Sequence, residues 1–179
     1  RFVAIIDEAA KQHGRARLEL VNQRINYAIR YVSDRAHWHR ADVWSAPFDR
    51  HHEGTFQTGT GDCEDYAIAK YVALRNAGTP ARDLRLLVVR DKSVHSYHAV
   101  LAARANGQWL LLDNRWRRLI PDHEARFFKP LFALNTAGVE RFTDVRVRAD
   151  NHRTPVKRTA QATGRTILAG ELGPTPGSV

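Results

Sequence analysis

The sequence has few of the features that define several large classes of protein. It contains one cysteine, Cys63, and no methionine among its 179 residues. A single cysteine excludes an intramolecular disulfide and argues against a metal site built on thiolates. No apolar run approaches the roughly 18 residues that a membrane-spanning helix needs, so we expect no transmembrane segment.

The chain also lacks a secretory signal peptide and an initiating methionine, since it opens at Arg1. We therefore expect a trimmed or processed chain. Loss of an export signal fits this beginning and favours a periplasmic location. A cut chain that never carried a signal would look the same, so a cytoplasmic location stays open.

Acidic residues are scarce relative to basic ones. The 28 Lys and Arg residues exceed the 19 Asp and Glu residues and give a net charge of +9. Such a surplus attracts acidic partners through long-range electrostatics. The arginines are scattered, however, and no nucleic-acid-binding motif accompanies them, so we expect a solvated basic surface and no nucleic-acid partner.

The hydrophobic pattern predicts three helices in the first half of the chain. Apolar residues recur at helical spacing, and they do so in three stretches: residues 2–12, 15–32 and 63–77. Asp62 is a suitable N-cap for the third helix, and Gly78 stands where a C-terminal cap belongs. Residues 33–61, between the second and third helices, are polar and aromatic and predict a long ordered loop.

Strands follow the third helix, and the resulting fold class is α+β. We expect strands at residues 84–89, 95–105 and 108–113. The last two are joined by Asn106-Gly107, a strong signal for a tight hairpin. One domain should cover residues 1–144, and residues 145–179 form a basic, polar C-terminal tail without a core-forming pattern.

Cys63 is predicted to lie in the first turn of the third helix, after a glycine-rich stretch. The partial positive charge of a helix N-terminus stabilises a thiolate and lowers the pKa of the thiol. The free backbone N–H groups there can bind an oxyanion. Asp62, Glu64 and Asp65 work against the thiolate, so a histidinium or a bound cation would have to offset them.

The predicted hairpin brings a histidine and a carboxylate together. If Asn106-Gly107 forms a two-residue turn, position 100 pairs with 113 and position 98 with 115. His98 and Asp113 then lie diagonally on one face, within about 7–8 Å of each other from backbone to backbone across the hairpin. A Cys–His–Asp triad needs such a pair, in which the histidine accepts the thiol proton and the aspartate fixes its tautomer.

Four segments carry a resemblance to a known family: VWSAP, GDCEDYAIAKY, SYHAVLAAR and WLLLDNR. They resemble the bacterial transglutaminase-like cysteine proteinases, the LapG-like periplasmic proteases, over residues 42–121. The resemblance implies a papain/transglutaminase-like fold, with a helical lobe whose cysteine helix packs on an antiparallel sheet. It also implies that Cys63 is the nucleophile, His98 the general base and Asp113 the orienting carboxylate. The loop at residues 47–61 is longer than the family leads us to expect.

The resemblance also implies calcium at the acidic residues that flank the cysteine. Asp62 and Glu64 correspond directly, and Asp65 less closely; carboxylate oxygens are the ligands that Ca²⁺ prefers. The alternative is helix capping, in which the same carboxylates satisfy the first turn. We expect no organic cofactor.

Other residues before the cysteine are weaker candidates for the site. Trp44 can line the active site and offer its indole N–H to the oxyanion, or it can be a packing residue. Four histidines lack the spacing of a standard zinc site and are expected to be loop or cleft residues: His37, His39, His51 and His52.

Three functions are consistent with these patterns. The leading one is a cysteine peptidase that cleaves a protein through a thioester acyl-enzyme. The family suggests the periplasmic retention segment of an acidic cell-surface adhesin as substrate, and an inner-membrane cyclic-di-GMP receptor as partner. A transglutaminase- or N-acetyltransferase-like acyl transferase would use the same triad. A non-catalytic basic binding module is the third.

Overall fold

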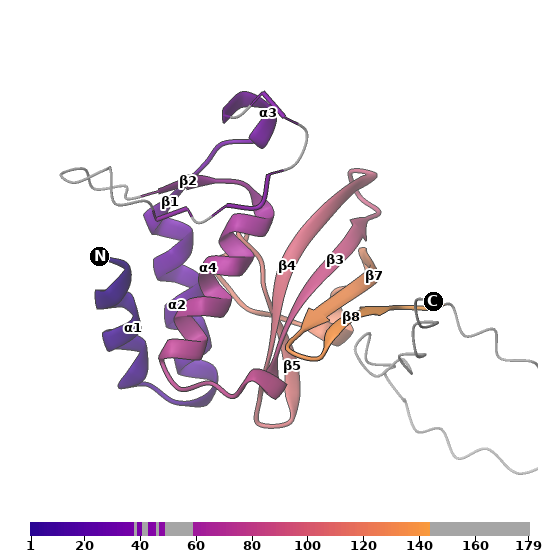
Figure 1. The fold of residues 1–179 in the computed structure, drawn as a ribbon. Helices are drawn as coiled ribbons and strands as arrows, with labels where there is room; N and C mark the ends of the chain where they lie inside the picture. Colours follow the sequence, from indigo (N-terminus) through magenta and orange to yellow (C-terminus); the bar gives the residue numbers. More distant parts are fainter. Residues whose placement is uncertain (38, 41–42, 46, 49–58, 144–179) are drawn as a thin grey trace, which may run out of the picture.

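The helices and the main sheet form two layers that pack against each other (Figure 1). The computed structural model describes residues 1–37, 39–40, 43–45, 47–48 and 59–143. The four helices are α1 (Phe2–Ala10), α2 (Gly14–Ala28), α3 (Asp34–His37) and α4 (Cys63–Asn76), and short 3-10 turns occur at Ala81–Asp83 and Asp122–Glu124. None of the described helices is long and apolar enough to cross a lipid bilayer.

The main sheet has six antiparallel strands in the order β6-β5-β4-β3-β7-β8. Their bounds are Leu84–Asp91 for β3, Ser96–Ala105 for β4, Gln108–Leu112 for β5, Ile120–Pro121 for β6, Phe128–Asn135 for β7 and Gly138–Arg141 for β8. The three expected strands are confirmed as β3, β4 and β5. The α+β class and the helix packed on an antiparallel sheet are confirmed as well.

Strands β7 and β8 are additions that the sequence pattern does not predict. Pro130 interrupts β7, and proline cannot donate to a strand ladder. The sheet accommodates it with a register shift between Val88 and Val89 of β3, and β8 pairs only with the later part of β7, Phe132–Asn135. The proline is therefore tolerated because it lies outside the segment paired on both sides.

The predicted helix over residues 15–32 is wrong at its C-terminal end. Helix α2 stops at Ala28, and Ile29–Tyr31 forms the short strand β1. Strand β1 pairs in parallel with β2 (Gly59–Gly61), immediately before α4. The hydroxyl of Tyr66 donates to the Ile29 carbonyl at 2.6 Å and holds the backbone there. Tertiary pairing thus overrides the helical periodicity.

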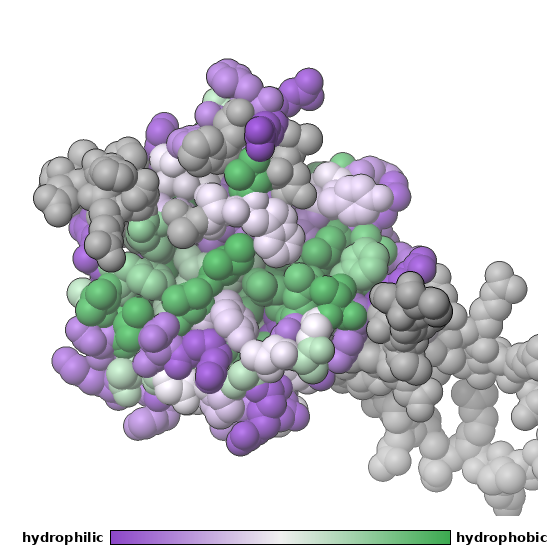
Figure 2. Space-filling model, in the orientation of Figure 1, coloured by the Kyte–Doolittle hydropathy of each residue, from purple (hydrophilic) through white to green (hydrophobic). Residues whose placement is uncertain are grey.

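Hydrophobic residues fill both faces of the sheet. On one face, Leu101 and Ala103 of β4 join the core made by α1, α2 and α4. On the other face, Val100 and Ala102 pack with residues of β3, β5 and β7. His98 has the same strand parity as this second pair and lies near its Phe128 ring, at 5.7 Å between ring centroids. In the view of Figure 2, hydrophobic residues form a band across the middle of the molecule, between hydrophilic residues above and below.

Candidate active site

The N-terminus of α4 is built by a capping box. Asp62 is the N-cap, and its backbone N–H donates to Asp65 Oδ2 at 3.2 Å. The other oxygen of Asp65 accepts from the backbone N–H of Ser45 at 2.8 Å and from its hydroxyl at 3.2 Å. The N-cap expected at Asp62 is confirmed. The segment around Ser45 is thereby tied to the first turn of the cysteine helix.

Gly61 allows this cap to form. A Cβ atom on residue 61 would lie 2.5 Å from Asp65 Oδ2 and 2.6 Å from Asp65 Cβ. Those separations are far below van der Waals contact, so a larger residue would displace the carboxylate. The glycine before Asp62 is needed for the close approach of the chain to the cap.

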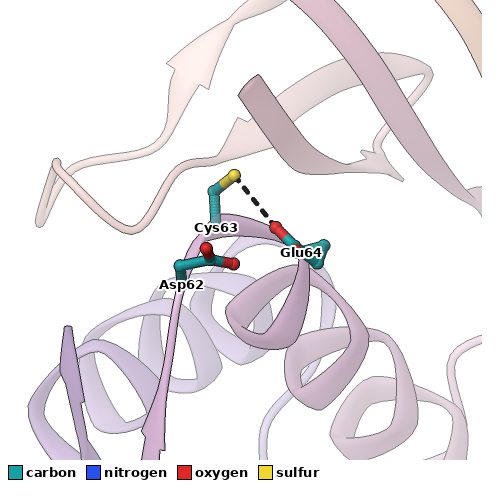
Figure 3. A group of neighbouring side chains, drawn as sticks. All are labelled: Asp62, Cys63 and Glu64. Atoms are coloured by element: carbon teal, nitrogen blue, oxygen red, sulfur yellow. Dashed lines mark hydrogen bonds between the residues drawn. The ribbon is translucent and has the colours of Figure 1, made fainter. Parts of the chain in front are cut away.

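Cys63 is the first residue of α4, and its side chain points away from the helix (Figure 3). The thiol donates a hydrogen bond to Glu64 Oε2 at 3.2 Å. Burial raises the pKa of Cys63 to about 12, and the negative charge of Glu64 adds to the rise. A hydrogen bond from the backbone N–H of Ala99, on β4, acts in the opposite direction. The thiol is therefore protonated at neutral pH in this arrangement.

Glu64 is an unusual carboxyl group for the surface end of a helix, because only 6% of the residue is exposed. Burial, together with a hydrogen bond with Asp62, raises its pKa to about 8. The side chains of Asp62, Cys63 and Glu64 present ligand atoms within 4.8 Å of one another. Oδ1 of Asp62 is buried and has no hydrogen-bond partner.

His98 and Asp113 meet across the hairpin of β4 and β5. Leu101 pairs with Leu112 and Ala105 with Gln108, which is the register that the Asn106-Gly107 turn predicts. His98 Nε2 lies 3.1 Å from Asp113 Oδ1, and both side chains are buried. Burial alone would raise the pKa of Asp113, but hydrogen bonds from His98 and Arg115 hold it well below its usual range.

Two cationic side chains near Asp113, Arg115 and Lys70, were not predicted from the sequence. Arg115 bonds Asp113 through Nη2 at 2.9 Å, and its Nη1 reaches Asp91 at 2.8 Å. Lys70 of α4 is fully buried, and its Nζ donates to the Leu112 carbonyl at 3.1 Å. The signal for Lys70 was a lysine inside the apolar stripe of a predicted helix, between Ala67 and Leu74.

Burial lowers the pKa of Lys70 to about 7, against the opposing charge of Asp113. The lysine therefore interacts with the end of β5 in two ways. Its ammonium group donates to the Leu112 carbonyl, and its charge interacts with the carboxylate of the next residue, Asp113. No comparable signal marks Arg115, because its partner Asp91 lies at the end of β3, distant in sequence.

The remaining candidates are less closely linked to the thiol. Trp44 is 46% exposed, and its neighbour Ser45 contacts the cap of α4. His37 closes α3 and His39 follows it, whereas His51 and His52 lie outside the described residues. In the described part of the chain, the two groups that could hold a metal are Asp62–Cys63–Glu64 and Asp34–Asp62–Asp65, and neither includes a histidine.

A thiol at a helix N-terminus, together with an imidazole–carboxylate pair whose histidine precedes Ala99, the residue whose N–H bonds the sulfur, supplies the parts of nucleophilic catalysis. Comparison with known proteins agrees with this chemistry. The calcium-bound LapG of Legionella pneumophila is 26% identical, with a TM-score of 0.63 over 77% of this chain and 74% of that one. Its EGTA-treated form is also 26% identical, with a TM-score of 0.65 over 80% and 75%.

No match was found among curated protein sequences. The family model of the bacterial transglutaminase-like cysteine proteinases, in contrast, matches residues 4–128. That span includes α4, the β4–β5 hairpin and all the residues of the site described above. The chain belongs to the bacterial transglutaminase-like cysteine proteinases and is a cysteine protease.

Proposed function

We propose that Cys63, His98 and Asp113 form the catalytic triad of a peptidase that cleaves a protein through a thioester acyl-enzyme. The observation that carries this proposal is the buried His98–Asp113 pair at 3.1 Å. The histidine of this pair lies on β4 next to Ala99, whose N–H bonds the sulfur of Cys63. The nucleophile and the histidine therefore come from adjacent parts of the two layers.

In the proposed mechanism each reacting atom has a task. Because Nε2 of His98 is held by Asp113, Nδ1 is the ring nitrogen left to accept the thiol proton of Cys63. The sulfur then attacks the scissile carbonyl carbon, and the backbone N–H groups at the start of α4 stabilise the oxyanion. The imidazolium gives its proton to the leaving amine, and water attacks the thioester to release the acid and the free thiol. Trp44 is the proposed additional donor to the oxyanion.

The first turn of α4 fits a calcium ion. Asp62 Oδ1 is buried without a partner, and the Glu64 carboxyl group lies beside it. These two residues would hold the ion. Asp65 is the third carboxylate of the proposed set, but both of its oxygens already accept hydrogen bonds. A bound Ca²⁺ supplies positive charge that offsets the carboxylates next to the thiol.

The proposed substrate is the periplasmic retention segment of a cell-surface adhesin, and an inner-membrane cyclic-di-GMP receptor is the proposed regulatory partner. Large adhesins of this kind are acidic, and the net charge of +9 favours encounter with an acidic protein. A periplasmic location follows from this proposal.

The test uses a purified adhesin segment encoded near this protein, incubated in calcium-containing buffer with a fluorescent amine. Mass spectrometry separates the two outcomes. Hydrolysis yields two fragments with free termini, as we expect, whereas acyl transfer leaves the amine on the new carboxyl end. Cys63→Ala is the control and should yield neither. The proposal would be wrong if the adhesin segment stays intact and the Cys63 thiol of the wild type reacts no faster than free cysteine.

A further inference from the structure

Arg115 joins two buried carboxylates, one at the end of β3 and the other just after β5. Its Nη1 lies 2.8 Å from Asp91 Oδ2, at the end of β3, and its Nη2 lies 2.9 Å from Asp113 Oδ2, just after β5. Nε is 3.3 Å from each oxygen of Asp113, and the backbone N–H of Arg115 donates to Oδ1 at 2.9 Å. Both aspartates are almost completely buried, at 1% and 0% exposure.

The far end of this connection is itself fixed. Asp91 accepts the backbone N–H of Ser93 at 2.9 Å, and the Ser93 hydroxyl bonds the same oxygen. Although burial acts to raise the pKa of Asp91, the hydrogen bonds from Ser93 and Arg115 hold it at about 2. Asp91 is therefore a permanent anion at neutral pH, and it anchors the guanidinium to β3.

The near end restricts the carboxylate that His98 uses. Asp113 Oδ1 is shared by His98 Nε2 and the backbone N–H of Arg115, while Oδ2 is taken by the guanidinium. A carboxylate held at both oxygens cannot rotate away from the imidazole. The Phe128 ring lies against both partners, 5.5 Å from the guanidinium carbon and 5.7 Å from the His98 ring centroid.

We propose that Arg115 and Asp91 are positioning residues of the active site, which act through Asp113 to fix the orientation of His98 and to keep the carboxylate ionised. This proposal rests on the proposed function, because it assigns His98 and Asp113 to the triad. A guanidinium suits the task because its planar group directs different N–H bonds at two carboxylates at once, whereas an ammonium offers only a point charge. Asp91, distant in sequence, belongs to the site through this arginine.

The test follows the alkylation rate of Cys63 by iodoacetamide as a function of pH, in calcium-containing buffer. This readout reports the thiolate that the triad forms, and it requires no substrate. In the wild type the rate falls on the acid side when the triad takes up a proton. Arg115→Gln removes one of the two cations near Asp113 and leaves Lys70, so the carboxylate binds a proton more readily. The acid limb of the profile, where the rate falls as the pH decreases, should therefore move up by about one pH unit.

Turnover of the adhesin segment gives a second readout. We expect kcat of Arg115→Gln to fall by about 10-fold to 100-fold with little change in KM, as expected for a misplaced catalytic group. Asp91→Asn leaves the guanidinium in place without its anchor and should produce a smaller fall of the same kind. Arg115→Lys keeps the charge and should restore the acid limb more fully than it restores kcat.

Arg104→Gln is the matched control, because Arg104 pairs with Asp83 at 2.6 Å on the exposed part of the same sheet. Its acid limb and its kcat should equal those of the wild type. The proposal is overturned if Arg115→Gln, folded by circular dichroism, behaves like Arg104→Gln. If Arg115→Gln does not fold, Arg115→Lys and Asp91→Asn decide by the same two readouts. A wild-type thiol no faster than free cysteine would instead defeat the proposed function.

Discussion

Cys63 donates its thiol hydrogen bond to Glu64, the next residue in the chain, at 3.2 Å (Figure 3). The proposed nucleophile is thus bonded to a carboxyl group whose own pKa is raised to about 8, so Glu64 is largely protonated at neutral pH. Proton transfer to His98 requires that the thiol leave this acceptor. The state described here is therefore a resting arrangement of the first turn of α4, and charge added near Glu64 will change it.

The first prediction concerns calcium. Removal of calcium with EGTA should abolish turnover and lower the melting temperature, because a ligand selective for the folded state stabilises it by mass action. Added calcium should restore both quantities. Asp62→Ala and Glu64→Ala should imitate chelation, and calcium should not rescue them.

The capping interpretation makes a different prediction for the same experiment. If the carboxylates only cap α4, Asp62→Ala should cost about 1 kcal/mol of unfolding free energy, and EGTA should change neither turnover nor melting temperature. Glu19→Ala is a suitable control, because Glu19 forms an exposed pair with Arg15 on α2, far along the chain from Asp62.

The second prediction addresses the triad. Cys63→Ala should abolish hydrolysis and leave the fold intact. His98→Ala should have nearly the same effect, because the members of a triad act as a unit and their losses do not add. Asp113→Asn should cost less if orientation is the main role of the aspartate. Steady-state hydrolysis and circular dichroism check these results, and substantial turnover by Cys63→Ala would rule out covalent catalysis there.

The third prediction uses the buried lysine. The native pKa of Lys70 is about 7, below the ordinary 10.5 that it regains on unfolding. Between these values the unfolded chain binds the additional proton, so this residue makes the unfolding free energy rise with pH. Lys70→Met should lack the rise, and it should gain most over the wild type below pH 7.

Urea unfolding from below pH 7 to about pH 10.5 measures the difference in unfolding free energy between Lys70→Met and the wild type. The advantage of the variant should shrink as the pH increases. Lys92→Met, which changes an exposed lysine after β3, provides the control for loss of a positive charge. A difference that does not depend on pH would show that Lys70 does not titrate in this range.

The fourth prediction tests the close approach at Gly61. Gly61→Ala should place a methyl group against the Asp65 carboxylate and break the cap of α4, at a cost of about 1–3 kcal/mol. Asp65→Ala removes both the cap and the obstacle. The double variant should therefore be less destabilised than the sum of the two single changes. Chemical denaturation of the four proteins gives the coupling, and additive effects would contradict a steric conflict between these residues.

The sequence predicts the parts of the fold and site that depend on local signals. The register of β4 and β5 follows from Asn106-Gly107 and the two-residue period of strands, and it places His98 beside Asp113. The start of α4 follows from Asp62 and the capping pattern. Each of these features is determined within a short stretch of chain, so a single sequence carries enough information.

Features that depend on distant segments are not predicted. Strand β1 looks like the end of a helix until Gly59–Gly61 pairs with it. The sequence gives no sign that Arg115 is more than an exposed arginine, because its second partner, Asp91, lies at the end of β3. Whether calcium or capping explains the acidic first turn also depends on the three-dimensional arrangement, in which Asp62 Oδ1 stays without a partner while Asp65 is fully bonded.

The parallel pairing of Ile29 with Gly59 has a consequence for the order of folding. The hairpin that carries the imidazole and its carboxylate closes through contacts near in sequence, and such contacts form early. The segment leading to the nucleophile is fixed only when Ile29–Tyr31 meets Gly59–Gly61, and closing that loop carries a larger entropic cost than closing the hairpin. A nascent molecule would thus complete its base before its nucleophile, and it would stay inert as a protease until the whole domain has assembled.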